Sequence, residues 1–426
     1  MLVRRNVYDL DPNGPELRAY ARGITAMKKR PLSDPTSWAY QANIHGTEER
    51  RLRPGWNSCQ HGSWFFPSWH RMYLYWFERI VRRASGLNGF ALPYWNYEKE
   101  GQERLPWAFR RPAKPDNALY VEERSRQANG GETPSGSLTS SRQALATKQF
   151  ISTNGVAGFG GQRQDDGTGF LNGALEQAPH NTMHVWIGGR GLMSAFETAA
   201  RDPIFWLHHA NIDRLWEVWL AQEGGRSNPT DEDKWMNETF VFFDEDGRRR
   251  EMSGRQIVDT VRQLDYEYDD LSGGNQGPQS AGRAMAPASD GERTTLAGRE
   301  GVVLGNRRST VSLAVAPGGA ATPVLELTDV SATVDDGFAY EIYVGLRPGA
   351  TPDFRDPAFV GTLSSFGMPR SGQGGHAGHG GGASYRFAIE GGLPDGDVAV
   401  TFVPVVTPDR ANAGGNVRIG RLAITG

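Results

Sequence analysis

Seven of the nine histidines in this 426-residue chain lie between residues 45 and 209. They form two sets, one within residues 45–70 and one within residues 180–209. Imidazole nitrogen is a ligand for copper, zinc, iron and nickel. The residue types and their spacing therefore predict one metal centre with two half-sites, which consist of His45, His61 and His70, and of His180, His184 and either His208 or His209.

The absence of acidic ligands from the two histidine sets indicates which metal the centre holds. No aspartate or glutamate lies at ligand spacing within them, which favours a site made only of imidazoles. His180 and His184 are four residues apart and can present two nitrogens to one point on a helix. Two copper ions on three histidines each could reduce dioxygen with one electron from each metal, whereas zinc has no redox chemistry. A histidine-bound zinc protein and a purely structural role for single buried histidines are the alternatives.

Helices are predicted at the positions that must carry these histidines. Residues 15–29 have apolar side chains at helical spacing, and residues 37–44 predict a second helix that leads to His45. Residues 67–83 predict a central helix, because Pro67 suits a first helical turn, Gly86 can end the helix, and apolar residues cover most of its sides. One of its faces carries His70, Leu74, Phe77 and Val81.

Two further helices are predicted around the second histidine set. Residues 179–186 place His180 and His184 one turn apart on one face. Asp202 followed by Pro203 indicates a helix start, and that helix should continue to about Glu223. Helices that carry inward histidines predict a helical bundle with the metal inside it.

The apolar pattern changes toward the C-terminus. A strand and turn are expected in the segment that begins at Lys234, and a helix at residues 253–264. Beyond about residue 308 apolar and polar residues alternate in short segments, which is typical of a β-sandwich or barrel. We therefore predict an α + β protein with a helical-bundle dicopper catalytic domain at 1–270, a linker at 271–307 and a β-rich domain at 308–426.

Composition narrows the partners and the surroundings of the chain. The formal net charge of −3 argues against nucleic acid or an anionic membrane surface as a partner. No apolar run is long enough for a transmembrane helix, and the first residues do not resemble a signal peptide. The single cysteine excludes an internal disulfide framework. We expect a cytoplasmic protein, and the sequence carries no indication of its oligomeric state.

Two long segments resemble a known family. Residues 61–78, HGSWFFPSWHRMYLYWFE, are similar to the first copper signature of the type-3 copper proteins, which include tyrosinases, catechol oxidases and polyphenol oxidases. Residues 202–213, DPIFWLHHANID, are similar to the second. The resemblance implies two copper ions, a phenolic substrate and O2. It also selects His209, four residues before Asp213, as the ligand and leaves His208 as a packing residue.

The order of segments resembles that of plant polyphenol oxidases, and the chain resembles a bacterial relative of these enzymes. That layout implies a catalytic domain followed by a β-rich domain that covers the active site in a latent state. The motif at Tyr266–Tyr268 marks the end of the catalytic domain in that family, and Arg4 or Arg5 could stack on it. A side chain from the loop at 364–382 could fill the substrate site, and this loop contains Phe366, Met368, His376 and His379. The two loop histidines are expected to lie in a mobile loop rather than in a metal site.

The resemblance also implies individual roles around the copper ligands. Cys59, two residues before His61, resembles the cysteine that forms a thioether with a ligand histidine in fungal relatives; a free buried thiol is the alternative. Glu176 and Asn181 match residues that hold a water able to deprotonate a phenol, although a solvated glutamate is an equal alternative. Phe196 matches a bulky gate over one copper, and a core phenylalanine is the other interpretation. Val185 would border the substrate ring.

Asp213 lies one turn after His209, and a hydrogen bond to it could fix ligand rings. The alternative is a salt bridge with Arg214 or another arginine. Glu78 and Arg71 are expected to form structural charge pairs.

These observations predict a copper-dependent oxidoreductase that uses O2. We expect it to hydroxylate monophenols at the ortho position and to oxidise o-diphenols to o-quinones. A catechol or o-aminophenol oxidase without monophenolase activity is one alternative. A hemocyanin-like O2 carrier is another, because it has the same copper chemistry without substrate access.

Overall fold

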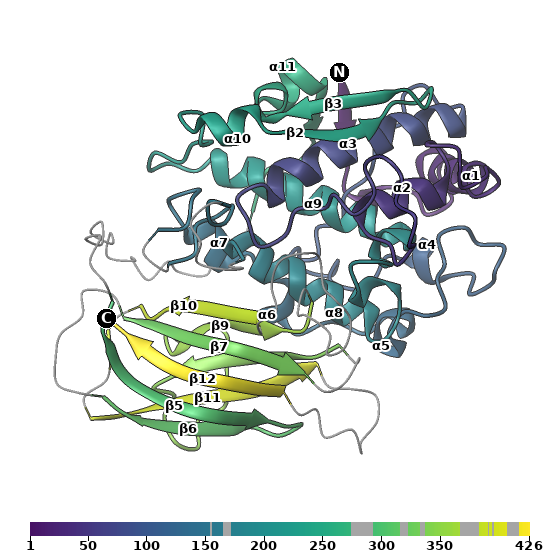
Figure 1. Ribbon diagram of the computed structural model, residues 1–426. Helices are drawn as coiled ribbons and strands as arrows, with labels where there is room; N and C mark the ends of the chain where they lie inside the picture. Colours follow the sequence, from purple (N-terminus) through teal and green to yellow (C-terminus); the bar gives the residue numbers. More distant parts are fainter. Residues whose placement is uncertain are drawn as a thin grey trace.

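A helical region and a β region follow one another in the chain and lie against one another in the computed structural model (Figure 1). The structure describes all residues except 154–155, 165–171, 274–292, 316–322, 333–336, 367–382, 391, 394–395 and 407–416. Met368, His376 and His379 therefore lie outside the described residues. Among the helices that are described, none combines the length and the apolar character that crossing a membrane requires.

The helical region is built on a few long helices joined by short helical segments. The longer helices are α1 (Pro15–Lys28), α2 (Trp38–His45), α3 (Phe66–Ser85), α8 (Thr182–Gly188) and α9 (Pro203–Leu220). The shorter segments are η1 (Val7–Asp9), α4 (Trp107–Arg110), α5 (Arg126–Gly130), α6 (Gly136–Thr139), α7 (Arg142–Ala146), η2 (Glu176–Asn181), η3 (Leu192–Ser194), η4 (Ala199–Arg201), α10 (Asp233–Asn237), η5 (Gly254–Gln256) and α11 (Thr260–Leu264). Helices at the predicted histidine positions are thus confirmed.

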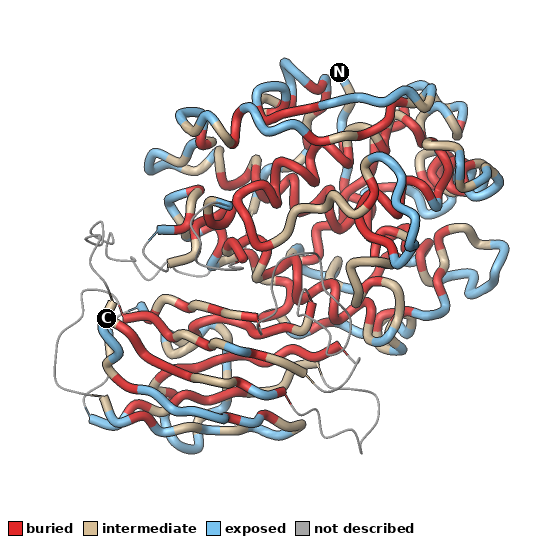
Figure 2. The backbone as a smooth tube through the Cα atoms, viewed as in Figure 1, coloured by how far each residue is buried: buried red, intermediate tan, exposed pale blue. Residues whose placement is uncertain are grey.

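Helix α3 is central, as its apolar sides predict. Pro67 lies in its first turn, where the missing N–H leaves no bond unmade. Gly86 ends the helix with a φ of 71°, a left-handed conformation that favours glycine. Trp69, Leu74 and Phe77 have no exposed surface. Figure 2 shows α3 and α9 as largely buried, so the histidines that these helices carry are held inside the protein.

Helix α9 begins where its sequence predicts and ends slightly earlier. The Asp202 carboxylate accepts a 3.0 Å hydrogen bond from the Ile204 N–H and thereby caps the first turn. The helix ends at Leu220 rather than near Glu223. Gly224 and Gly225 follow with φ of 99° and 76°, a backbone conformation that cannot continue a helix.

Two small sheets complete the helical region. Strand β1 (Leu2–Arg4) pairs in parallel with β4 (Tyr266–Tyr268), so the start of the chain lies beside the end of the helical region. Strand β2 (Thr239–Phe243) pairs with β3 (Arg249–Ser253) as a hairpin. The single helix predicted at 253–264 is wrong. Ser253 forms a capping box with Gln256 around the short η5, the chain leaves helical geometry at Ile257, and Asp259 starts α11.

The β region consists of two four-stranded antiparallel sheets with a common core, which confirms the predicted sandwich. One sheet has the order β10-β7-β12-β5 and the other β6-β11-β8-β9. The strands are β5 (Thr295–Leu304), β6 (Ser309–Ala314), β7 (Val324–Ala332), β8 (Ala339–Val344), β9 (Phe359–Ser364), β10 (Ala383–Ala388), β11 (Asp397–Val406) and β12 (Val417–Thr425). The linker predicted at 271–307 extends too far, because β5 pairs with β12 inside the sandwich.

The β region packs on the side of the helical region that contains α6 and α8 (Figure 1). The backbone N–H of Gly337 donates to the carbonyl of Gly189 at 2.9 Å. Gln143 Nε2 donates to the carbonyl of Val360, also at 2.9 Å. Phe366, which follows β9, belongs to the core of the helical region rather than to that of the sandwich. The β region therefore reaches into the other half of the molecule.

Candidate metal centre

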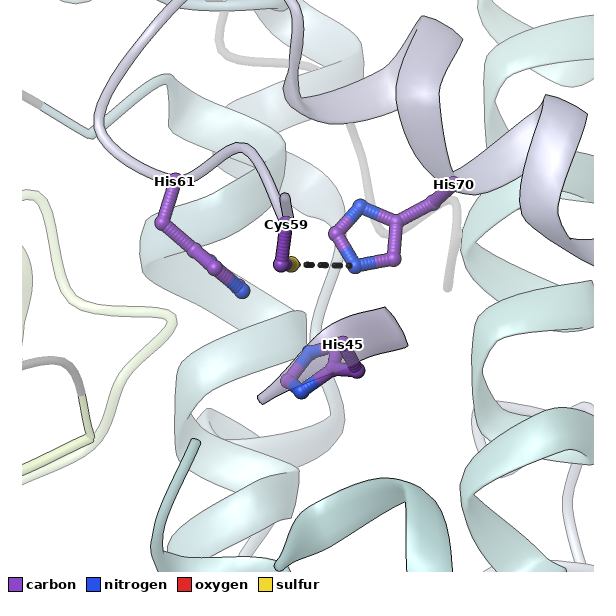
Figure 3. Close-up of side chains that lie close together, drawn as sticks. All are labelled: His45, Cys59, His61 and His70. Carbon is purple, nitrogen blue, oxygen red and sulfur yellow. Dashed lines mark hydrogen bonds between the residues drawn. The ribbon is translucent and has the colours of Figure 1, made fainter. Parts of the chain in front are cut away.

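The first histidine cluster consists of His45, His61 and His70, whose side chains point toward one another with Cys59 among them (Figure 3). His45 ends α2, His70 lies near the start of α3, and His61 lies in the connection between these helices. The three imidazole centroids are 5.3, 5.6 and 5.8 Å apart. One ligand atom from each of the four residues lies within 4.8 Å of the others. Three imidazoles thus surround one point.

The second cluster consists of His180 at η2, His184 on α8, and His208 and His209 on α9. Its four ligand atoms also lie within 4.8 Å of one another. His209 Nε2 lies 3.3 Å from His184 Nε2. The ring of His208 stacks on that of His180 at 5.4 Å and lies 5.8 Å from the ring of Tyr97. Both α9 histidines thus lie against His180 or His184.

The two clusters lie side by side. The rings of His70 and His209 stack with centroids 4.2 Å apart and planes inclined by 11°. His61 and His180 are 5.4 Å apart by the same measure. Helices α3 and α9 therefore bring one ligand of each cluster into direct contact, and the two half-sites form one centre.

The Nδ1 atoms of five of the predicted ligands have acceptors that orient the rings. The contacts measure 2.7–2.8 Å and join His45 to the Phe196 carbonyl, His61 to the Glu176 carboxylate, His70 to the Phe66 carbonyl, His180 to the Asn181 side-chain oxygen and His184 to the Met193 carbonyl. A carbonyl oxygen only accepts, so Nδ1 carries the proton and donates. The Nε2 lone pair is then left for a metal, as is usual for metal-binding histidines.

Burial favours the neutral form of four of the cluster imidazoles. It lowers the pKa of His70, His180, His184 and His209 well below the ordinary value, and neighbouring histidines lower each pKa further. Neutral imidazole is the form that binds metal. Two all-imidazole sets with oriented Nε2 atoms fit copper, which accepts nitrogen ligands readily. The residues present therefore fit a pair of copper ions.

Glu176 and Asn181 both lie against the ligands. Glu176 Oε1 accepts from His61 Nδ1 at 2.7 Å, and the N–H of Gly62 donates to Oε1 and Oε2 at 3.1 and 3.0 Å. The carboxyl is 1% exposed, so the interpretation of Glu176 as a solvated residue is wrong. Burial raises the pKa of Glu176 well above its ordinary value, although the N–H groups of Gly62 and Gly173 oppose this shift.

Cys59 is predicted to form a thioether with His61, but in the structure its sulfur contacts His70. Its Sγ lies 3.5 Å from His70 Nε2 (Figure 3). Burial raises the pKa of the Cys59 thiol well above its ordinary value, and Glu176 raises it further. The thioether to His61 stays a prediction.

Aromatic side chains close the centre from the side of the β region. The ring of Phe196 stacks on that of His61 with centroids 4.4 Å apart. Phe366 lies 4.7 Å from Phe196 and contacts the rings of both clusters. Val185 is buried, and a Cβ on Gly337 would lie 3.0 Å from its Cγ1, so the β region also covers this residue.

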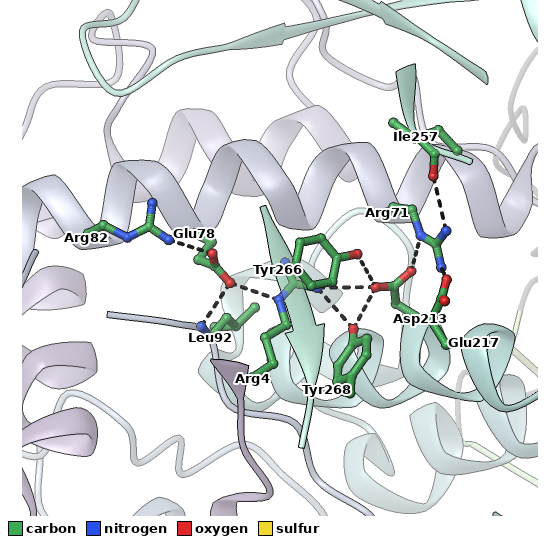
Figure 4. Close-up of polar contacts among 10 residues, drawn as sticks. All are labelled: Arg4, Arg71, Glu78, Arg82, Leu92, Asp213, Glu217, Ile257, Tyr266 and Tyr268. Carbon is green, nitrogen blue, oxygen red and sulfur yellow. Dashed lines mark hydrogen bonds and ion pairs between the residues drawn. The ribbon is translucent and has the colours of Figure 1, made fainter. Parts of the chain in front are cut away.

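A buried charge network centres on Asp213 of α9 (Figure 4). The Asp213 carboxylate accepts from Arg71 Nε at 2.5 Å, from Arg4 at 3.2 Å, and from the hydroxyls of Tyr266 and Tyr268 at 2.5 and 2.6 Å. Its partners are thus Arg71 and Arg4, not the neighbouring Arg214. The guanidinium of Arg4 stacks on the ring of Tyr266 at 3.7 Å, which confirms one of the two predicted arginines.

This network ties the two ligand-bearing helices together. Arg71 follows His70 on α3, and Asp213 lies one turn after His209 on α9. Arg71 also pairs with Glu217, and Glu78 pairs with Arg4 and Arg82, which confirms structural charge pairs for Arg71 and Glu78. Burial acts to raise the pKa of Asp213, but Arg71 and Arg4 outweigh it, and the pKa lies below its ordinary value.

Some residues of the site carry no signal in the sequence. The carbonyls that orient His45, His70 and His184 belong to the backbone, and any residue type could supply them. The side chain of Asn172, which lies between Glu176 and Asn181, also escaped sequence analysis. An asparagine four residues before a glutamate has no distinctive pattern.

A helical bundle that buries two adjacent histidine clusters defines a dinuclear metalloprotein, and comparison with known proteins gives its family. The common central domain of tyrosinase matches residues 35–222, and the polyphenol oxidase middle domain matches residues 228–274. The chain is 37% identical over 313 residues to tyrosinase HcTyr1 of Hahella sp. (strain CCB-MM4), an alignment that covers 63% of each protein. It is 33% identical to a chloroplastic polyphenol oxidase of Spinacia oleracea, over 63% of this chain and 47% of the relative. The matches thus span about half to two thirds of these curated relatives.

Solved structures agree with this relationship. The polyphenol oxidase of Grenache (Vitis vinifera) is 31% identical, with a TM-score of 0.51 over 63% of this chain and 85% of that chain. A latent aurone synthase has the same fold over 99% of this chain and 88% of its own, with a TM-score of 0.69 at 21% identity. The chain belongs to the tyrosinase and polyphenol oxidase family. The cofactor of this family is a pair of copper ions, which the two histidine clusters fit.

Proposed function

We propose that this protein is a phenol-oxidising copper enzyme that uses O2. It hydroxylates monophenols at the ortho position and oxidises o-diphenols to o-quinones. The observation that carries this proposal is the contact between the two histidine clusters. Hydrogen bonds at Nδ1 orient the rings, and the chain belongs to a family of dicopper proteins. When bound, two copper ions supply the electrons for O2 reduction, one from each metal.

The residues of the chain bind and orient the substrate. Phe366 lies against His184, and we propose that the phenol ring takes this place when the β region moves away. Phe196 and Val185 then border the ring and hold its reactive carbon toward the centre. Aromatic and aliphatic walls exclude water from the site, as in most small-molecule pockets.

Glu176 and Asn181 are proposed to assist loss of the phenolic proton. Both are buried beside the clusters, which supports a role near the reacting oxygen. The proton would pass to the carboxylate through a water held between the substrate and these side chains. Glu176→Gln should then reduce monophenol turnover more than diphenol turnover. The proposed proton transfer precedes hydroxylation, a step that monophenols undergo and diphenols skip. Equal losses for both substrates would contradict this role.

We also propose that the described structure corresponds to a latent state. Phe366 has no exposed surface and contacts His61, His180 and His184, so a substrate ring that stacks on His184 would have to displace it. Removal of the β region, by truncation near residue 300, should raise phenol turnover. Equal activity of the full and the truncated chain would contradict latency.

One experiment separates the proposed function from its alternatives. Purified protein is loaded with copper, its metal content is measured, and quinone formation is followed with a monophenol and its matching diphenol in air. Turnover of both substrates supports the proposal, and turnover of the diphenol alone indicates a catechol oxidase. Reversible O2 binding without quinone indicates a carrier, and one metal per chain would overturn the dicopper assignment.

A further inference from the structure

The amide of Asn172 lies between two side chains that contact ligands of different clusters. Glu176 contacts His61 of the first cluster, and Asn181 contacts His180 of the second. Asn172 is 3% exposed, and Gln177 Nε2 holds its backbone carbonyl at 3.1 Å. The side chain is therefore buried at a junction of the two half-sites, on a backbone that Gln177 holds in place.

Hydrogen bonding decides how this amide is oriented. With Nδ2 toward Glu176, it donates to the carboxylate oxygens at 3.2 and 3.3 Å, and its Oδ1 accepts from Asn181 Nδ2 at 3.0 Å. The reverse orientation would place the amide oxygen against a carboxylate and one NH2 group against another. Each buried polar group left without a bond costs about 1–3 kcal/mol. The first orientation is therefore the stable one.

The resulting hydrogen bonds have one direction. His180 Nδ1 donates to the side-chain oxygen of Asn181, whose Nδ2 donates to Asn172. Asn172 in turn donates to the Glu176 carboxylate. His61 Nδ1 donates to the same carboxylate from the other side. The Glu176 oxygens accept in both cases, so this carboxyl group ends both chains of donors.

We propose that Asn172 is a positioning residue that connects the Glu176 carboxylate to His180. One carboxyl group, that of Glu176, then orients a ligand in each cluster, His61 directly and His180 through two amides. In both rings the proton is held on Nδ1, and Nε2 is left for copper. The inference rests on the copper assignment of the clusters and not on the proposed reaction, so it can be tested without turnover.

The experiment measures copper binding to one cluster at a time. His70→Ala leaves the three predicted ligands of the second cluster in place, and His209→Ala leaves those of the first. Each background receives Asn172→Leu, which removes both hydrogen bonds at similar volume. Asn172→Ala is a second variant, because it removes the amide that joins Glu176 and Asn181 without adding a new polar or charged group. Asn96→Leu, at another buried asparagine, is the matched control.

Copper(II) is titrated against a competing chelator, and unfolding of the metal-free proteins is followed in parallel. We expect Asn172→Leu to weaken copper binding about 10–100-fold in the second cluster, the usual effect of removing a group that supports a ligand. The first cluster should lose much less, because His61 keeps its direct bond to Glu176. Asn96→Leu should change neither affinity.

Unchanged affinity of the second cluster, or equal losses in both clusters, would overturn the proposal. Lower unfolding stability without a cluster-specific change in affinity would show that Asn172 only supports the fold. If Asn172→Leu does not fold, the same comparison with Asn172→Ala decides. Quinone formation by the unmodified protein tests the proposed function separately, so either result can fail alone.

Discussion

The ring of Phe366 lies nearly parallel to the imidazole of His184, with centroids 3.9 Å apart and planes inclined by 17°. Phe366 follows strand β9 of the β region, whereas His184 lies on α8 of the helical region. A side chain just beyond the end of strand β9 thus covers the face of a predicted copper ligand. In the latent state proposed above, this contact makes the position of the β region a determinant of access to the centre.

Phe366→Ala should raise diphenol turnover at low substrate concentration about tenfold or more. The reason is that a substrate which must first displace a side chain binds only the open fraction of the molecules. The measurement is quinone formation by full-length protein with equal copper content. Phe354→Ala is the control, because Phe354 packs at the domain contact near Gly136 and not on the histidines. Equal activation by both variants would indicate general loosening of the β region instead of a plug.

The two neighbouring histidines on α9 should differ in their effect on copper content. His209→Asn should reduce copper from two ions per chain to about one, because His209 Nε2 faces His184 Nε2 at 3.3 Å. His208→Asn should retain both ions, because His208 stacks on His180 beside Tyr97. Metal analysis after dialysis gives the comparison. Loss of copper from the His208 variant alone would reverse the assignment.

Asp213 should make folding sensitive to acid. Its pKa is depressed, so its ion pairs stabilise the fold above the unfolded-state pKa of about 3.9 and are lost as the pH falls through the folded value. Asp213→Asn should lower the free energy of unfolding at pH 7 by about 3–5 kcal/mol, because Arg71 and Arg4 would stay buried with too little negative charge. It should also flatten the decline in stability below about pH 4.

Urea unfolding at several pH values, with chelator present to remove copper effects, measures both changes. Asp246→Asn is the control, because this carboxylate is 42% exposed and its ion pairs lie at the surface. Its effect should be below about 1 kcal/mol. An Asp213 variant no less stable than this control would contradict the role of the buried network.

The thioether at Cys59 is testable by peptide mass spectrometry. After exposure to copper and O2, we expect a peptide in which Cys59 is joined to His61 and no longer reacts with alkylating reagents. Fragmentation also distinguishes His61 from His70, whose Nε2 lies 3.5 Å from Sγ. Cys59→Ser provides the negative control. Full alkylation of the unfolded, copper-treated protein would contradict the cross-link.

Local patterns were enough to predict much of the fold. Apolar spacing and capping residues located α1, α3 and α9 within a few residues, because helix ends depend on neighbours such as Asp202 and Gly86. Alternation of apolar and polar residues predicted most strands of the sandwich. Strand β5 was missed, since the polar side chains within its Thr295–Leu304 span resemble a linker until β12 pairs with it.

By itself the sequence determined which residue types could form the centre, because imidazole chemistry and helical spacing are properties of the chain alone. The tertiary structure alone decided how they meet: the stacking of His70 on His209, the backbone acceptors of the rings, the place of Asn172 between Glu176 and Asn181, and the position of Phe366 over His184. Most of these contacts join residues that are far apart in the sequence, so no local pattern relates them. The others depend on the direction in which a side chain points, which only the folded structure fixes. Burial makes these contacts important for stability, because polar and charged groups that are removed from water must find partners within the protein.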